Sequence, residues 1–370
     1  MDAVALARDL VRFPSLNPPG DEKACVEHVA RLLSGLGFAV ESFEFAPTRP
    51  SLVAKVVGAS SSKPLCFTGH LDVVPIGNAP WHYPPFDGVI ADGALHGRGS
   101  CDMKSGIAAF IAAAADMLGQ DASLRRGLTF VITTGEETGC EGAFDLCRRN
   151  VLGDAELLVV AEPTSNCPVV AHKGSLRVAV TARGKSAHSS MPEEGDNAIG
   201  KVAGWITRLH AHRFDRIHPL LGRTTAVVTT MSGGQNINSV PDIARFTADF
   251  RTLPDDDHAA LLRELQAMFG NQAEIQLVTD FKGFATNPDS AALRPLIDLL
   301  SRRLGRSPTL LGAPYFTDAS ALVPGFGNAP AVVIGPGKFE QCHKTDEHCP
   351  VADIVNAKEL YRELMLSMCL

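Results

Sequence analysis

Several features that would place the chain in a specialised class are missing. The formal net charge is −7 and no cluster of basic residues occurs, which argues against a nucleic-acid partner. No apolar run is long enough to span a bilayer, and the first residues lack the pattern of a signal peptide, so we expect no membrane association. The nine cysteines form no CxxC pair and their number is odd, which favours reduced thiols. We therefore expect a cytoplasmic protein.

The length and the order of the apolar patterns predict more than one domain. A chain of 370 residues exceeds what one compact core usually holds. Helical patterns alternate with short β-rich runs in the first and last parts of the chain, which indicates helices packed on a largely parallel sheet. The expected helices cover residues 2–13, 21–36, 104–119, 140–150 and 290–304, and the expected strands cover 38–46, 51–57, 65–69, 128–134, 156–161 and 330–334.

The middle of the chain follows a different order. Strand, helix, strand, strand, helix and strand patterns occur at 175–183, 194–212, 224–231, 241–251, 256–269 and 273–280. This βαββαβ order is typical of a ferredoxin-like domain. We therefore predict an α/β fold with a mixed, largely parallel central sheet flanked by helices. Residues 1–175 and 284–370 would form it, and a smaller domain at 176–283 would be inserted.

Residues that can bind metal ions follow the predicted strands. His70 and Asp72 come at the end of the strand at 65–69, two positions apart and therefore on the same face. A carboxylate beside a ligand histidine fixes the tautomer of the ring, although a capped strand end would look the same. Asp102 lies between a glycine-rich loop and the helix at 104–119, where it could bridge two cations or simply cap the helix.

Three further segments carry the same residue types. Glu136 and Glu137 follow the strand at 128–134, and two adjacent carboxylates there would repel unless a cation or a shared proton compensates. An acidic pair at a helix start is the alternative. Glu162 follows the strand at 156–161, and His343 lies in a loop before the last helix. Open α/β sheets place their sites at strand ends, and this donor set suits zinc, cobalt or manganese.

Six segments occur in an order that resembles a known family. They are GHLDVVP, GRGSCDMKSG, TTGEETG, AEPT, GKSAHSS, and GPG followed by CHKTDE. They look like the co-catalytic metallo-aminoacylase and peptidase family, which includes acetylornithine deacetylase, succinyl-diaminopimelate desuccinylase, aminoacylase, dipeptidases and carboxypeptidases. The likeness extends from about Phe13 to Pro350. It implies a zinc-peptidase-like sheet, and it makes residues 176–283 a lid and dimerisation domain, so a homodimer is expected.

The resemblance also implies a ligand set. His70 and Glu162 would bind one metal ion, Glu137 and His343 would bind a second, and Asp102 would bridge both. The expected cofactors are two divalent ions, with zinc first and cobalt or manganese as the alternatives. One departure from the family pattern is that a cysteine flanks each of Asp102 and His343, and we expect both thiols to be small packing residues rather than ligands.

Other residues receive roles from the same resemblance. Asp72 would orient the first histidine ligand, and Glu136 would be the general base. His188, in the lid, matches a histidine that reaches the partner subunit's active site, where it could donate to an oxyanion. Asn238 and Arg251 could bind a substrate carboxylate, since a bidentate arginine suits that task, although a surface salt bridge explains Arg251 equally well.

The implied reaction is hydrolysis of the amide bond of a small N-acyl amino acid, of the deacetylase or desuccinylase type. A bridging hydroxide would attack the carbonyl with the help of a glutamate general base. The partner is then a small molecule that carries a carboxylate. A dipeptidase or carboxypeptidase, or a hydrolytic deaminase, could use the same dinuclear site. A protein that has lost catalysis would lack a ligand or the base, and the sequence lacks neither.

Overall fold

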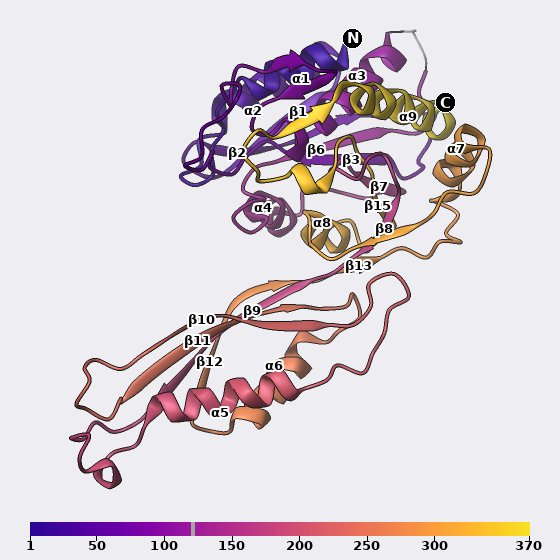
Figure 1. Ribbon diagram of the computed structural model, residues 1–370. Helices are drawn as coiled ribbons and strands as arrows, with labels where there is room; N and C mark the ends of the chain where they lie inside the picture. The colour runs from indigo at the N-terminus through magenta and orange to yellow at the C-terminus, as the bar shows by residue number, and fades with distance from the viewer. Residues whose placement is uncertain (120–122) are drawn as a thin grey trace. The chain divides into compact units, whose positions relative to one another are not determined.

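The computed structural model describes residues 1–119 and 123–370, and the chain forms two compact units (Figure 1). The first unit contains residues 1–170, 285–311 and 317–370, and the second contains residues 171–284 and 312–316. Over the described ranges, no helix combines the length and the apolar character that crossing a membrane requires. That the second unit serves as a lid and dimerisation domain stays a prediction.

The first unit is built on a mixed sheet, as the sequence predicted. Its strands run in the order β1-β2-β6-β3-β7-β15-β8-β13, where β13 is Phe284–Ala285, and β14 (Leu311–Ala313) also pairs with β8. The inner strands β6, β3, β7 and β15 are parallel to one another, whereas β1, β2 and β8 pair antiparallel with their neighbours. The bounds are β1 Ala39–Ala46, β2 Arg49–Val56, β3 Leu65–His70, β6 Leu128–Thr133, β7 Leu157–Val160, β8 Val169–His172 and β15 Ala331–Val333. Every residue of β3, β6 and β7 is buried, as is typical of parallel strands covered on both faces.

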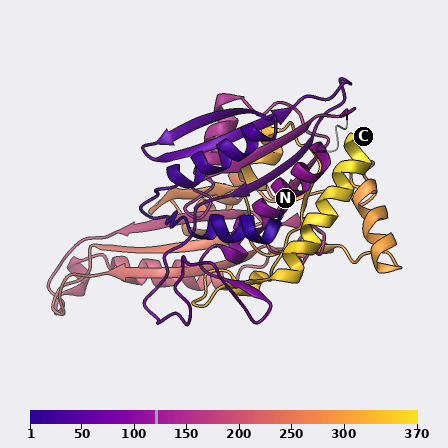
Figure 2. The same ribbon diagram turned by 90° about the horizontal axis from the view of Figure 1, so that it is seen from above.

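Helices cover both faces of this sheet. α1 (Ala3–Val11), α3 (Ser105–Leu118) and α9 (Val351–Cys369) pack on one another over one face, while α4 (Glu141–Arg149) and α8 (Ala319–Gly325) pack together on the other (Figure 1). α7 (Arg294–Leu304) lies beside α9, as the view from above shows (Figure 2), and α2 (Lys23–Gly35) shares a core with α1. α3 is almost wholly buried, and its alanines favour a helix while leaving room for close neighbours.

Short elements that the sequence did not predict complete the first unit. β4 (Val89–Ala91), β5 (Ala94–His96) and β16 (His348–Pro350) form a separate three-stranded sheet in the order β16-β5-β4. This sheet joins the segment just before α9 to the segment just before the glycine-rich loop. Other short elements are η1 Ser100–Lys104 and η3 Phe339–Gln341, whereas β13 and β14 lie where the chain passes between the two units.

The second unit has the βαββαβ order predicted from the sequence. It consists of β9 (Ser175–Arg183), η2 (Pro192–Glu194), α5 (Ala198–Ala211), β10 (Thr225–Gly233), β11 (Ile243–Arg251), α6 (His258–Phe269) and β12 (Ala273–Phe281). The strands form an antiparallel sheet in the order β10-β11-β9-β12. Alternate residues of β9 and β11 form its core with the buried face of α5, which includes Val202, Trp205 and Leu209.

A glycine in α3 lets the helix approach the end of β7. A methyl group on Gly106 would lie 2.1 Å from the carbonyl oxygen of Ala161, the residue before Glu162. Because that oxygen belongs to the backbone, we expect Gly106→Ala to lower the free energy of unfolding by about 1–3 kcal/mol, measured by urea denaturation. Gly204→Ala in α5 is the control, because nothing lies within 4 Å of the added methyl group, and it should stabilise by about 0.5–1 kcal/mol. Equal effects of the two substitutions would contradict the contact.

Candidate metal centre

The carboxyl ends of three parallel strands bring together four of the predicted residues. His70 is the last residue of β3, and it pairs in register with Thr133, the last residue of β6. Glu136 and Glu137 follow β6 by three and four positions, and Glu162 follows β7 by two. Because neighbouring parallel strands end at the same edge, residues far apart in sequence meet there.

Asp102 reaches the same place from an irregular turn rather than a strand. It lies in η1, where its φ of −115° and ψ of 94° are not helical. The turn starts after Gly97 and Gly99, whose φ values of 145° and 80° lie in a region that side chains other than glycine rarely adopt. Asp102 is therefore not an N-cap of α3, which begins at Ser105.

Among the described residues, two groups of side chains have the spacing to hold a metal ion, and they share one member. The first consists of His70, Asp102 and Glu162, and the second consists of Asp102, Glu137 and His343, with potential ligand atoms within 4.8 Å in each group. The Oδ1 atom of Asp102 lies 3.1 Å from Nε2 of His70, and its Oδ2 atom lies 3.3 Å from Nε2 of His343. Each oxygen of one carboxylate therefore faces a different group.

The remaining distances are equally short. Nε2 of His70 lies 3.5 Å from Oε1 of Glu162, and Nε2 of His343 lies 3.0 Å from Oε2 of Glu137. The groups differ in burial, because the side chain of His70 is 1% exposed and that of His343 is 54% exposed. The first group is thus enclosed, and the second opens to solvent.

The charges at the site perturb one another. Burial raises the pKa of Glu162 to about 8 and that of Glu137 to about 7, and the Asp102 carboxylate contributes to both shifts. The contacts with Asp102 and Glu137 raise the pKa of His343 to about 10. Crowded carboxylates with two imidazoles form an excess of negative charge that a divalent cation would neutralise. The oxygen and nitrogen donors and their spacing therefore fit divalent metal ions.

Asp72 holds the end of β3 together with the loop after β6. Its Oδ1 atom lies 3.5 Å from Nδ1 of His70, and its carboxylate accepts hydrogen bonds from the backbone N–H groups of Glu136 and Glu137 at 3.2 and 3.1 Å. Sequence reasoning missed Asn17, which donates to Oδ2 of Asp72 at 2.8 Å and to Oγ1 of Thr138 at 2.9 Å. The sequence marked Asn17 only as part of a turn.

Glu136 belongs to neither group of potential ligands. Its side chain is buried, and the thiol of Cys140 donates a long hydrogen bond of 3.9 Å to Oε1. Burial raises the pKa of Glu136 well above its usual value, although the nearby His70 opposes this. A buried carboxyl beside a cation site, with a raised affinity for protons, has the character of a proton acceptor.

The second unit contains the other three predicted residues. Ser189 donates its backbone N–H to the carbonyl of Asn238 at 3.0 Å, so His188 and Asn238 lie on adjacent segments. Arg251 is the last residue of β11, whereas Asn238 lies before that strand begins at Ile243. Eight steps along a strand span roughly 26 Å, so the two side chains do not share a ligand within one subunit. Nη2 of Arg251 instead contacts Oδ2 of Asp249 at 3.1 Å.

The two cysteines beside predicted ligands are free thiols outside both groups. Cys101 is buried and Cys342 is half-buried against the main core.

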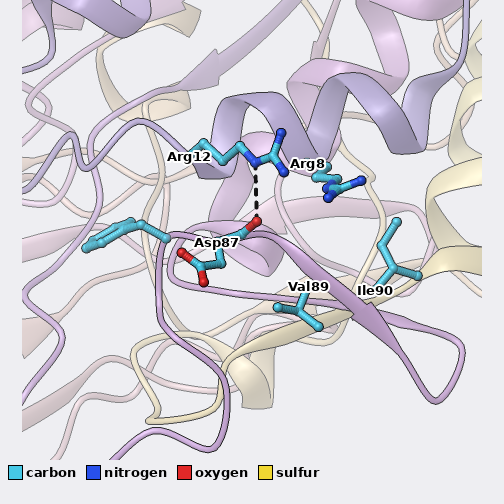
Figure 3. A pocket seen from close by; sticks show the side chains of 6 residues that line it. Arg8, Arg12, Asp87, Val89 and Ile90 are labelled. Carbon is cyan, nitrogen blue, oxygen red and sulfur yellow. Dashed lines mark hydrogen bonds between the residues drawn. The ribbon is translucent and has the colours of Figure 1, made fainter.

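A different feature of the first unit is a pocket between α1 and the segment before β4. It is lined by Arg8, Arg12, Phe86, Asp87, Val89 and Ile90. There, Nε of Arg12 donates to the carbonyl of Asp87 at 3.3 Å (Figure 3). With one carboxylate and no histidine, that pocket lacks the donors found at the strand ends.

Two potential ligand groups that share a carboxylate at the ends of parallel strands are an arrangement that suits metal-assisted hydrolysis. The sequence model of Peptidase family M20/M25/M40 matches residues 66–367. Succinyl-diaminopimelate desuccinylase from Gluconacetobacter diazotrophicus is 31% identical over 97% of this chain and 95% of its own length. The protein of the same name from Rhodospirillum centenum is 31% identical over 98% and 96%.

Solved structures share the fold. Aminopeptidase PepT from Bacillus cereus superposes with a TM-score of 0.81 at 24% identity, covering 99% of this chain and 98% of its own. The metallo-carboxypeptidase Sso-CP2 from Sulfolobus solfataricus gives the same TM-score and the same coverage at 18% identity. The chain belongs to Peptidase family M20/M25/M40. It is a metal-dependent amidohydrolase, which confirms the class predicted from the six sequence segments.

Proposed function

We propose that the chain removes the acyl group from a small N-acyl amino acid, as a deacetylase or desuccinylase. The observation that carries the proposal is the pair of ligand groups that share Asp102, with the buried carboxyl of Glu136 next to them. The desuccinylase relatives, each covered over almost the full length, support an acylated amino acid as the substrate. The substrate would be a small molecule with a carboxylate.

Two divalent ions would occupy the groups. His70, Asp102 and Glu162 would hold one, and Asp102, Glu137 and His343 would hold the other. Zinc suits this mixture of imidazole and carboxylate donors, and cobalt and manganese are the alternatives. Such ions supply Lewis acidity toward an amide carbonyl and acidify water.

The side chains around the ions would carry the proton transfers and the alignment. Glu136 would accept a proton from water at a carboxylate oxygen and then donate it to the departing amine nitrogen. Asp72 would keep the ring of His70 in one orientation and one tautomer, which outer partners of ligand histidines do.

The second unit would complete the site as a lid in a homodimer. His188 would reach the active site of the partner subunit and donate to the developing oxyanion. Asn238 and Arg251 would bind the substrate carboxylate. Because Arg251 ends β11 and Asn238 lies before its start, the two would bind one carboxylate only from different subunits. Size-exclusion chromatography with light scattering tests this arrangement, and a fully active monomer would contradict it.

A substrate panel tests the proposed reaction. After reconstitution with zinc, cobalt or manganese, kcat/KM is measured for N-acetyl and N-succinyl amino acids and for dipeptides, with the chelator-treated protein as the blank. We expect kcat/KM for one N-acyl series to exceed that for the dipeptides by at least about tenfold. A binding pocket typically discriminates by about 10–200-fold between substrates that differ by a small group. A preference for dipeptides would instead make the chain a peptidase, and activity only on amidine-like or aromatic amines would make it a deaminase.

A further inference from the structure

A buried ion pair lies next to the candidate metal centre and contains none of its potential ligands. Nη1 of Arg98 lies 2.6 Å from Oε2 of Glu347, and the two side chains are 2% and 0% exposed. Removing two charges from water is costly, and a buried pair forms stably only if further hydrogen bonds satisfy both partners. The contacts of this pair therefore indicate what it holds in place.

The Glu347 carboxylate binds the backbone of Asp102 and of the residues just before it. Oε1 accepts hydrogen bonds from the backbone N–H groups of Cys101 at 2.8 Å and Asp102 at 3.0 Å, and Oε2 accepts one from Gly99 at 3.0 Å. Asp102 does not have helical backbone angles, and one backbone bond crosses the turn, from the N–H of Lys104 to the carbonyl of Gly99 at 3.0 Å. The three backbone bonds to the Glu347 carboxylate further fix the turn that presents the Asp102 side chain to both groups.

The Arg98 guanidinium extends the same connection to two other segments. Nη1 donates to the carbonyl of Lys344 at 3.1 Å, directly after His343, and Nη2 donates to the carbonyl of Pro75 at 3.1 Å, in the segment that follows β3. The rigid, planar fork of arginine suits bonds to several fixed acceptors. The pair therefore links the segments that carry three of the five potential ligands.

We propose that Glu347, together with Arg98, is a positioning residue for the metal centre. It holds the Asp102 turn and the His343 loop at the separation that allows one carboxylate to face both ligand groups. The inference rests on the proposed function, because it assumes that these groups bind metal ions. Loss of a partner behind the ligands typically weakens metal binding by about 10–100-fold.

The experiment compares two buried glutamates that are both paired with an arginine. Glu347→Gln places an amide where a carboxylate now accepts four donors. Glu22→Gln is the matched control, since Glu22 is also 0% exposed, its Oε1 lies 3.2 Å from Nη2 of Arg49, and it belongs to neither ligand group. The second partner of Arg49 is Glu141, and neither Glu22 nor Arg49 bonds the Asp102 turn or the His343 loop. For both variants and the wild type, the Kd for zinc is measured by competition with a chromophoric chelator, well below the Tm of each protein.

We expect the wild type to bind two zinc ions and Glu347→Gln to bind zinc about 10–100-fold more weakly. Glu22→Gln should bind zinc with the wild-type affinity, although its Tm should be lower. If the wild type binds two ions and Glu347→Gln binds them equally tightly, the Arg98–Glu347 pair only stabilises the fold. This outcome overturns the positioning role but leaves the proposed function intact. If the wild type binds none of zinc, cobalt and manganese in the same competition assay, the proposed function fails as well. Should Glu347→Gln not fold, Arg98→Lys decides: weaker zinc binding supports the positioning role, and wild-type affinity overturns it.

Discussion

Glu136→Gln is expected to retain two metal ions and to lose turnover by about 10²–10⁴-fold, the usual contribution of a positioned general base. The substitution keeps the size of the buried side chain but removes its ability to accept and return a proton. Glu136 lies outside both ligand groups, so the metal content, measured by elemental analysis, should not change. The loss should appear in kcat on the preferred N-acyl amino acid, while KM changes little.

The adjacent residue provides the control for this experiment. Glu137→Gln alters the neighbouring carboxylate, whose Oε2 atom lies 3.0 Å from Nε2 of His343 in the second group. We expect this variant to bind fewer than two ions, and added metal should recover part of its activity. A nearly normal kcat in Glu136→Gln would exclude its role as a general base. Equal loss of metal in both variants would show that Glu136 and Glu137 do not have separate roles as base and ligand.

Asp102→Ala should have the second large effect, because it removes a ligand from both groups at once. Each group would keep two side chains, and we expect the protein to retain less than one metal equivalent after dialysis. The ions are worth several kcal/mol of transition-state stabilisation, and each 1.36 kcal/mol is a factor of ten, so kcat should fall by roughly 10³-fold or more.

A ligand of only one group gives the comparison. His343→Ala removes a half-exposed side chain that belongs to the second group alone. It should lower the metal content from two equivalents toward one. If Asp102→Ala also loses only one equivalent, the carboxylate does not bridge two ions, and the assignment of a shared ligand is wrong.

Local sequence patterns were enough to predict the strand-end residues and the α/β fold. His70 ends a fully buried strand, and Glu137 and Glu162 follow two others. The parallel arrangement of these strands requires their ends to meet. The βαββαβ order of the second unit was visible because each element is long enough to show its own period.

The residues that hold the potential ligands in place could not be predicted in the same way. Arg98 and Glu347 lie 249 residues apart, and the three-residue strands β5 and β16 that bring their segments together are too short to show a period. Asn17 looked like a turn residue, and only the fold places it against Asp72. Asn238 and Arg251 could bind one group within a single chain only if they lay close together. The length of β11 keeps them apart.

The two ligand groups differ in how deeply they are buried, and this difference should affect how metal ions enter and leave them. His70 is 1% exposed and His343 is 54% exposed, so an ion in the first group would leave only through the rest of the site, whereas the second is open to chelators. We expect ion exchange to occur in two phases, fast at the outer position and slow at the inner one. Because the two positions share Asp102, departure of an outer ion would also change the affinity of the inner position, so their occupancies would be coupled.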